Sequence, residues 1–279
     1  MIARKIIYIF FVLSVFTSCG DVDDEKKTAT KNSTKTETAA LVNLETPSPT
    51  TEIRMDSSIT LDYLMGKFNP ETDNNFIKIE KKYASRSGMF LHKKAYKAFK
   101  EMHAAAKADG INLTIRSATR NFKSQKGIWE AKWTGARKVE DGQDISKTIP
   151  DPKQRALKIL EYSSMPSTSR HHWGTDIDIN AFTNKYFAQG KGKKEYDWLA
   201  ANAASFGFCQ PYTAKGEERP DGYNEEKWHW SYLPLSKPLI DQAKLRLKNE
   251  MVKGFKGAET ATEIDVVKKY VLGINQECL

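Results

Sequence analysis

The sequence predicts an α+β fold, because segments with helical periodicity are interspersed with only a few short alternating segments. The regular alternation of strand and helix that a wound parallel sheet requires is not seen, and no internal repeat is evident. Hydrophobic residues make up 39% of the 279 residues, which is enough for a packed core. The length suits one sizeable domain with extensions or two small domains.

The clearest helix is expected between Leu91 and Ala108, where apolar residues recur at helical spacing and the pattern stops before Gly110. Asp151 and Pro152 are typical of a helix start, with an aspartate cap and a proline in the first turn. Further helices are predicted over residues 124–137, 151–162 and 196–206, with Gly207 as the C-cap of the last, and two more between residue 238 and the end, one near 263–271.

Three short strands are predicted, over residues 111–117, 174–180 and 228–233. In the first, apolar Ile111, Leu113 and Ile115 alternate with other residues, as in a half-buried strand. The folded region is expected to begin near Ile59.

Residues 1–19 have the features of an export signal: a charged start, a short apolar run and small residues before Cys19. The apolar run is too short for a membrane span, which needs about 20 residues. The end of the segment resembles a bacterial lipobox, which implies acylation of Cys19; an ordinary signal peptide with an incidental cysteine is the alternative. We therefore expect a lipid-anchored protein of the cell envelope, periplasmic or associated with the outer membrane.

Residues 20–52 are rich in Thr, Lys, Glu, Ala and Ser and contain no aromatic residue. Such a composition cannot bury enough apolar surface to offset the entropy of ordering, so a disordered tether is expected. Its length would let an anchored domain stand off the membrane.

The formal net charge is +9, or +7 without Arg4 and Lys5 of the export signal. This surplus favours an anionic environment without choosing between nucleic acid, an anionic envelope polymer and a membrane surface. No nucleic-acid-binding motif accompanies the charge, so no nucleic-acid partner is expected.

Cys209 and Cys278 are the other two cysteines of the chain. In an oxidising compartment they could pair, which would tie the C-terminal segment to the domain. The sequence leaves this pairing and two unpaired buried thiols equally open.

Two stretches concentrate chemically active side chains. Residues 169–178 contain two adjacent histidines and two aspartates, and Glu226 and His229 follow later in the chain. Imidazole and carboxylate groups together suit zinc, and two histidines with one carboxylate leave the fourth position of a tetrahedral site open for water, as in catalytic sites. By contrast, His92 and His103 on one predicted helix would lie about 16 Å apart, too far to share a metal ion.

The segment Ser169–Asp178 resembles the Ser-x-His-x-x-Gly-x-Ala-x-Asp signature of zinc D-alanyl-D-alanine carboxypeptidases of the VanY and LAS type. Glu226–His229 resembles the Glu-x-Trp-His element of this family, and Ser117–Gln125 resembles its Ser-Gly-Tyr-Arg-Ser-x-x-x-Gln. The three motifs keep the family's order and spacing and cover roughly residues 85–235. The resemblance implies the LAS/VanY-type zinc peptidase fold (Hedgehog/DD-peptidase-like), a small antiparallel sheet flanked by helices.

The resemblance also implies that His171, Asp178 and His229 bind one zinc ion and that Glu226 is the general base. Zinc lowers the pKa of its bound water from about 16 toward 7, which provides a nucleophile at neutral pH. Because Glu226 precedes His229 by three residues, its carboxylate can lie beside the metal without binding it and can move a proton from the water to the leaving amine. The register of the motif favours Glu226 over its neighbour Glu225.

Arg120 matches the family arginine that meets the substrate's carbonyl oxygen or terminal carboxylate. A guanidinium group is always charged and offers a planar fork of donors to either group. Arg116 is the alternative, although at the end of a predicted strand it could simply face solvent.

Gln125 and Ser169 match family positions that help to hold the substrate; a helix-surface amide and a turn hydroxyl are the alternative interpretations. Trp228 is expected to contact the substrate, and together with Trp230 it would wall the pocket. Ordinary core packing explains the two tryptophans nearly as well.

Two positions depart from the family pattern. Asp176 stands where the family usually has Ala, and in a strand residues 176 and 178 point to the same face. Asp176 could therefore approach the metal or orient His171 or His172 by accepting a ring N–H. The pair 118–119, Ala-Thr, replaces Gly-Tyr beside the family arginine, which puts the choice of substrate in doubt.

The sequence thus predicts a lipoprotein signal (1–19), a tether (20–52), a zinc peptidase domain (53–235) and a C-terminal helical extension (236–279). The predicted function is exported, zinc-dependent hydrolysis of peptidoglycan stem peptides, as a D-alanyl-D-alanine carboxypeptidase. The alternatives are an endopeptidase on the same zinc core and a non-catalytic, zinc-containing module that binds the cell wall. The expected partners are stem peptides and, through the lipid anchor, a membrane.

Overall fold

A computed structural model describes residues 53–279 of the chain. The expected signal at 1–19, its Cys19 and the expected tether at 20–52 lie outside these residues. Within the described part, no helix combines the length and the apolar character needed to cross a membrane.

The strands within residues 53–279 form two antiparallel sheets, which confirms the α+β prediction. The smaller sheet pairs β1 with β2, and the larger one has the strand order β3-β4-β6-β5. The strand bounds are β1 Phe76–Lys78, β2 Phe90–His92, β3 Ile115–Ser117, β4 Asp176–Ile179, β5 Phe208–Cys209 and β6 His229–Tyr232.

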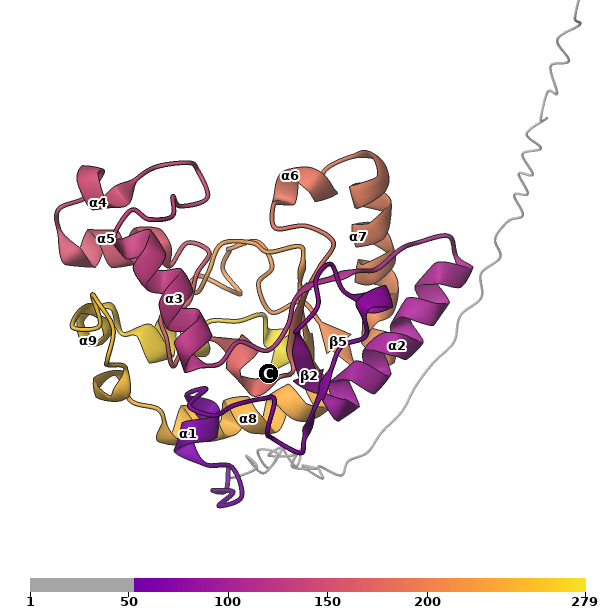
Figure 1. Ribbon diagram of the computed structural model, residues 1–279, viewed down its shortest axis with the longest axis horizontal. Helices are drawn as coiled ribbons and strands as arrows, with labels where there is room; N and C mark the ends of the chain where they lie inside the picture. The colour runs from indigo at the N-terminus through magenta and orange to yellow at the C-terminus, as the bar shows by residue number, and fades with distance from the viewer. Residues whose placement is uncertain (1–52) are drawn as a thin grey trace, which may run out of the picture. The chain divides into compact units, whose positions relative to one another are not determined.

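Helices surround the larger sheet, with α2, α6 and α7 on one side and α3, α4 and α5 on the other in the view of Figure 1. The helix bounds are α1 Leu61–Leu64, α2 Lys93–Ala108, α3 Phe122–Trp133, α4 Ile145–Thr148, α5 Pro152–Ile159, α6 Asn184–Phe187, α7 Gly190–Asn202, α8 Leu233–Arg246 and α9 Thr260–Ile264.

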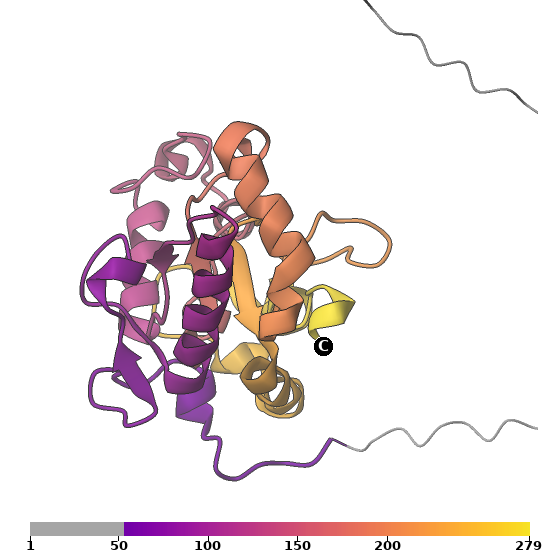
Figure 2. The same cartoon turned by 90° about the vertical axis from the view of Figure 1, so that its right-hand side faces the viewer.

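One hydrophobic cluster lies between the larger sheet and the helices α2 and α7, which cover the strands in Figure 2. Because side chains alternate along a strand, Ile177 and Ile179 of β4 and Trp230 of β6 point into this cluster. Phe99 of α2 and Leu199 of α7 are fully buried against them. The intervening polar residues of the same strands must therefore face the opposite side.

A second hydrophobic cluster joins α3 and α5 to the C-terminal segment. Trp129 of α3 is fully buried, and its indole N–H donates to the Lys256 carbonyl (2.8 Å). Ile240 of α8 and Ile264 of α9 pack in the same cluster. Residues 236–279 thus share a core with the preceding part, and the described residues 53–279 lie in one compact unit.

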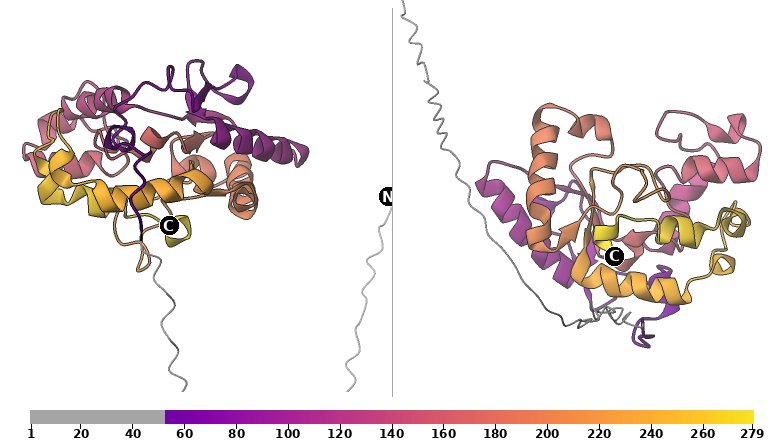
Figure 3. Two further views of the ribbon diagram at one scale, coloured as in Figure 1. Left: turned by 90° about the horizontal axis from the view of Figure 1, so that it is seen from below. Right: turned by 180° about the vertical axis from the view of Figure 1, so that it is seen from behind.

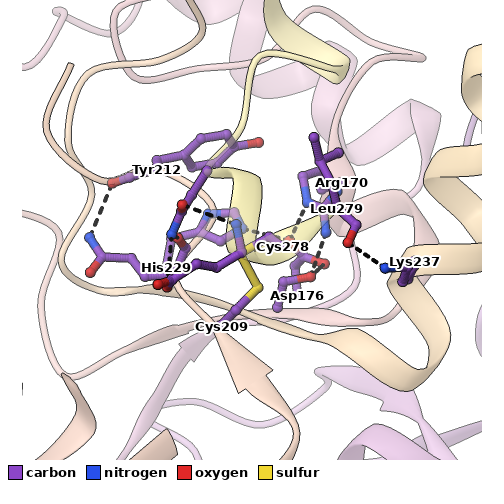
Figure 4. Close-up of a disulfide and its surroundings, with 12 residues drawn as sticks. Arg170, Asp176, Cys209, Tyr212, His229, Lys237, Cys278 and Leu279 are labelled. Carbon is purple, nitrogen blue, oxygen red and sulfur yellow. Dashed lines mark hydrogen bonds and ion pairs between the residues drawn. A yellow bond between two sulfur atoms is a disulfide. The ribbon is translucent and has the colours of Figure 1, made fainter. Parts of the chain in front are cut away.

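The C-terminal segment is fixed covalently, because Cys209 of β5 and Cys278 form a disulfide (Cα–Cα 5.9 Å; Figure 4). Of the two possibilities that the sequence leaves open, the structure has the pairing. In both views of Figure 3 the C-terminal segment lies beside α8, where Lys237 Nζ donates to the carbonyl of Leu279 (2.6 Å).

The bounds of several predicted elements differ from the observed ones, and three of the differences have a local explanation. The strand expected over 111–117 is reduced to β3, because Asn180 bonds the preceding backbone instead: its side chain accepts from Thr114 N (2.7 Å) and donates to Asn112 O (2.9 Å). Helix α8 begins before Pro238, which lies inside it. The helix expected near 263–271 is interrupted at Asp265, which adopts a positive φ of 57°.

Candidate metal centre

The polar face of the larger sheet brings two distant motifs together. Asp178 of β4 and His229 of β6 are direct register partners, so both side chains leave the sheet at the same place. His171 comes from a 3-10 turn, Arg170–Trp173, which ends at Gly174. Gly174 has a φ of 69°, and a Cβ there would lie 2.2 Å from the Phe76 ring, so glycine is required at this motif position.

The three predicted metal ligands lie together and are buried. His171 Nε2 is 3.3 Å from Asp178 Oδ2, and His229 Nδ1 is 3.4 Å from Asp178 Oδ1. One ligand atom from each residue lies within 4.8 Å of the others. Asp178 Oδ1 is buried and has no hydrogen-bond partner among the described residues, which is unfavourable unless a cation is bound there.

Both imidazole rings are held with one nitrogen toward this space. His171 Nδ1 donates to the Ala118 carbonyl (2.9 Å), which leaves Nε2 free to ligate. His229 Nε2 donates to Asp176 Oδ2 (2.8 Å), which directs Nδ1 to the site. Two imidazole nitrogens and one carboxylate oxygen are a donor set that suits zinc and leaves one coordination position open. The residues therefore fit a zinc ion.

The charges around His229 also favour a cation. Burial opposes its charged form, but hydrogen bonds to Asp176 and Glu226 raise the pKa of His229 to about 9. For Asp178, burial opposes ionisation, yet the neighbouring His171 and His229 hold its pKa at about 2. The site keeps its carboxylate ionised and presents it to a positive charge.

Glu226 lies beside the three ligand candidates, as its motif position predicts. Its Oε2 is 3.0 Å from His229 Nδ1, and its backbone N–H donates to Tyr212 O (2.9 Å). Burial raises the pKa of Glu226. Glu225 does not line the cavity; its carbonyl accepts from Asn184 (2.8 Å). The geometry therefore separates the two neighbours.

A cavity of about 440 Å³ opens onto the site. Its walls include all three ligand candidates, Glu226, Arg120, Gln125 and Trp228. They also carry cationic side chains that the motifs do not indicate: Arg86, Arg116, Lys132, Arg137, Lys138 and Arg170. Among the residues that the structure describes, the acidic ones on the walls are Glu140, Asp178 and Glu226. Positive charge thus dominates the surroundings of the site.

Arg120 is held in place from three sides. Its Nε donates to Gln125 Oε1 (3.0 Å), and its Nη1 donates to Ser117 Oγ (2.6 Å) and lies 3.5 Å from Asp178 Oδ2. Gln125 is 1% exposed and donates to the Ser164 carbonyl (2.8 Å), so it is not a helix-surface amide. Arg116 is exposed, and its guanidinium lies over the Phe182 ring (5.6 Å).

The remaining candidates divide between the cavity and the core. Trp228 lines the cavity and packs near Tyr162 (ring centroids 6.2 Å apart), whereas Trp230 points into the hydrophobic cluster on the other face of the sheet. Ser169 is 1% exposed and is not among the residues that line the cavity. Its hydroxyl has no hydrogen-bond partner among the described residues.

Asp176 does not orient His171 or His172, which the sequence left as its possible partners. It contacts His229 of the adjacent strand β6 instead, whereas the Nδ1 of His171 bonds the Ala118 carbonyl. His172 donates from Nδ1 to the Arg120 carbonyl and accepts at Nε2 from Ser167 N (3.1 Å). Burial lowers the pKa of His172 to about 3, so this histidine is neutral.

Arg170 and Lys132 are parts of the site that motif reasoning missed. Lys132 is 1% exposed, donates to Ser163 Oγ (2.6 Å) and pairs with Glu140. Lys132 stands between Trp129 and Trp133 in the same helix. This position could have indicated that the lysine is buried beside the two tryptophans. Arg170 lies between two motif residues and carried no signal of its own.

Comparison with known proteins agrees with the motifs. The family model of VanY, D-alanyl-D-alanine carboxypeptidase, matches residues 88–235. A D-alanyl-D-alanine carboxypeptidase of Enterococcus faecalis is 28% identical over 135 residues, which are 48% of this chain and 45% of that protein. The chain spans about half the length of the curated relatives it matches.

Two solved structures are similar at lower levels. A mutant of the vancomycin-resistance D,D-pentapeptidase VanY in complex with Zn(II) has a TM-score of 0.44 and 22% identity, over 61% of this chain and 84% of that one. VanYB in complex with D-alanine-D-alanine has a TM-score of 0.46 and 20% identity, over 65% of this chain and 89% of that one. The family match covers more than half of the chain, and it includes all three motifs. The chain belongs to the VanY D-alanyl-D-alanine carboxypeptidase family.

Proposed function

We propose that the protein is a zinc peptidase that removes the terminal D-alanine from peptidoglycan stem peptides. The observation that carries this proposal is the position of Glu226 beside His171, Asp178 and His229, in a cavity that also contains Arg120. Membership of the family and the name of the Enterococcus faecalis relative support the same activity.

His171, Asp178 and His229 would hold the zinc ion, and zinc supplies a more acidic bound water and a polarised carbonyl when it is present. Glu226 takes a proton from the attacking water and returns it to the leaving amine as the peptide bond breaks. Its raised pKa suits both steps, because a buried carboxylate accepts a proton more readily than an exposed one. The Tyr212 carbonyl fixes the backbone of Glu226 for this task.

Arg120 would bind the negative end of the substrate or the oxygen that becomes negative during attack. Its guanidinium is already positioned by Gln125 and Ser117, so little side-chain entropy is lost when the substrate binds. Gln125 in this account holds Arg120 rather than the peptide. Trp228 and Tyr162 form an apolar wall that would exclude water from one side of the reacting bond.

The charge of the cavity supports a substrate with more than one carboxylate. The cationic side chains named above come from several separate segments, including β3, α3 and the segment that follows α3. Stem peptides of peptidoglycan carry several carboxylates, and an anionic envelope polymer is consistent with the net charge of the chain.

We further propose export and lipid anchoring at Cys19, which would place the enzyme in the cell envelope at the periplasm or outer membrane. The charged start, the short apolar run and the small residues before Cys19 support this. Mass spectrometry of the mature N-terminus tests the proposal: an acylated Cys19 is expected, and an unmodified cysteine would contradict it.

The substrate is tested with a purified pentapeptide-stem muropeptide and cross-linked sacculi, each incubated with the zinc-loaded protein and followed by mass spectrometry. Loss of a single alanine from the pentapeptide is expected. Cleavage inside the stem or at the cross-link would instead indicate an endopeptidase. No product from a folded, zinc-bound protein would favour a module that only binds the cell wall.

A further inference from the structure

Asp176 is completely buried and has a full set of hydrogen bonds. Its Oδ2 accepts from Arg170 Nε (2.9 Å) and from His229 Nε2 (2.8 Å). Its Oδ1 accepts from Thr175 Oγ1 (2.5 Å) and Ser231 Oγ (2.8 Å). A buried carboxylate is costly unless it is paired and hydrogen-bonded in this way. The site therefore maintains a charged group that the family pattern, with Ala at this position, does not contain.

Arg170 supplies the balancing charge and is itself buried. Its guanidinium lies over the Trp173 ring (5.0 Å), and its Nη2 donates to Ser231 Oγ (2.5 Å). Ser231 in turn donates to Asp176, so the three side chains form a closed group behind His229. Figure 4 shows Arg170 and Asp176 pointing toward each other beside His229.

The position of Asp176 excludes it as a further metal ligand in this arrangement. Its Oδ2 contacts Nε2 of His229, and the ligand nitrogen Nδ1 lies on the other side of the imidazole. Asp176 also does not line the cavity, whereas Asp178 does. The carboxylate therefore acts on the ring of His229 and not on the metal position.

We propose that Asp176, held by Arg170, is a positioning residue for His229. It fixes the ring so that Nε2 carries a hydrogen and Nδ1 faces His171 and Asp178. A carboxylate that accepts the outer N–H of a ligating histidine also makes the ligand more basic, and loss of such partners typically weakens metal binding about 10- to 100-fold. This inference rests on the zinc site of the proposed function.

Two double variants separate positioning from stability. Both carry Arg170→Met; one combines it with Asp176→Asn and the other with Asp176→Leu. Each removes the buried ion pair as a whole, which is often tolerated when the replacements fill the space. Only the Asn variant can still accept from His229 Nε2, with its amide N–H groups donating to the hydroxyls of Thr175 and Ser231. The two variants therefore differ in the acceptor for His229 and in the partner of these two hydroxyls, and unfolding measurements account for the second difference.

The test is the dissociation constant for zinc alone, measured on the full chain by competition with a chromophoric chelator. The Leu variant should bind zinc about 10- to 100-fold more weakly than the Asn variant, and the Asn variant should stay within about tenfold of the unmodified chain. The visible absorption of bound Co(II) gives a second readout: the Asn variant should keep the spectrum of the unmodified chain, and the Leu variant should change it.

Equal zinc affinities in the two folded variants would overturn the positioning role and leave Asp176 as a purely structural partner of Arg170. Failure of the unmodified chain to bind zinc would overturn the proposed function as well, so the two failures are distinguishable. Denaturant unfolding of both variants identifies any general loss of structure.

Discussion

The strands β4 and β6 present alternate residues to two faces of the sheet that differ in chemistry. On one face Ile177, Ile179 and Trp230 pack against α2 and α7. On the other, Asp178 and His229 meet the turn that carries His171. The apolar face stabilises the strands, and the polar face uses that rigidity to hold ionisable groups at short distances. A register slip of one residue would exchange the two faces and remove both functions.

Removal of the Asp178 carboxylate should distinguish the two faces most clearly, because it affects metal binding on the polar face. Asp178→Asn should weaken zinc binding by more than about 100-fold, because the loss of a ligand exceeds the loss of a partner behind a ligand. Chelator competition measures the affinity, and far-UV circular dichroism checks that the strands remain. Zinc affinity equal to that of the unmodified chain would show that Asp178 is not a ligand.

Removal of the disulfide tests how much the C-terminal segment, attached at the edge strand β5, contributes to stability. Replacing Cys209 and Cys278 by serine opens a loop with a sequence separation of 69 residues. The free energy of unfolding should fall by about 4 kcal/mol, since the unfolded chain regains loop entropy. In urea unfolding, the variant and the reduced unmodified protein should have the same free energy of unfolding. If the oxidised protein had this value too, the disulfide would be contradicted.

The apolar face should respond in stability and not in metal binding. Ile177→Ala removes a fully buried side chain next to Asp178 and is expected to cost about 2–5 kcal/mol of unfolding free energy. Zinc affinity of the folded variant should stay close to that of the unmodified chain. A loss of affinity as large as that of Asp178→Asn would mean that the two faces are not independent.

The smallest effect concerns pH and the buried His172 behind the polar face. Its pKa is about 3 in the folded state and 6.5 as an ordinary histidine, so unfolding takes up a proton below pH 6.5. Stability should therefore fall as the pH decreases, with a contribution of at most about 1.4 kcal/mol per pH unit. Urea unfolding at pH 7.5, 6 and 5 measures the slope, and His172→Gln should reduce it. If His172→Gln left the pH dependence of stability unchanged, the proton taken up on unfolding would bind to a group other than His172.

Much of this arrangement could be predicted from the sequence. The α+β class, the long helix α2 and the alternation of β4 follow from local patterns, and the motifs place His171, Asp178, His229, Glu226 and Arg120 around one site. These predictions succeed because each motif is short and its spacing is fixed by a turn or a strand. The roles of the residues as zinc ligands and as general base stay predictions.

Partners from distant segments could not be predicted. The contact between Asp176 and His229 depends on the pairing of β4 with β6, and no local pattern specifies that register. Lys132 of α3 and the cationic residues after this helix line the cavity together with residues from distant segments, which no local pattern indicates. The contact of Gln125 in α3 with Arg120 in the preceding connection was also not predicted, and a role of Gln125 in holding the substrate stays a prediction.

A comparison of Glu226→Gln with Glu225→Gln decides whether the polar face is a peptidase site with Glu226 as its general base. Hydrolysis of the pentapeptide stem is measured for both at matched zinc content. Glu226→Gln should be slower by about 10²- to 10⁴-fold while zinc stays bound, and Glu225→Gln should keep the unmodified rate. Equal rates for Glu226→Gln and the unmodified chain would contradict the account.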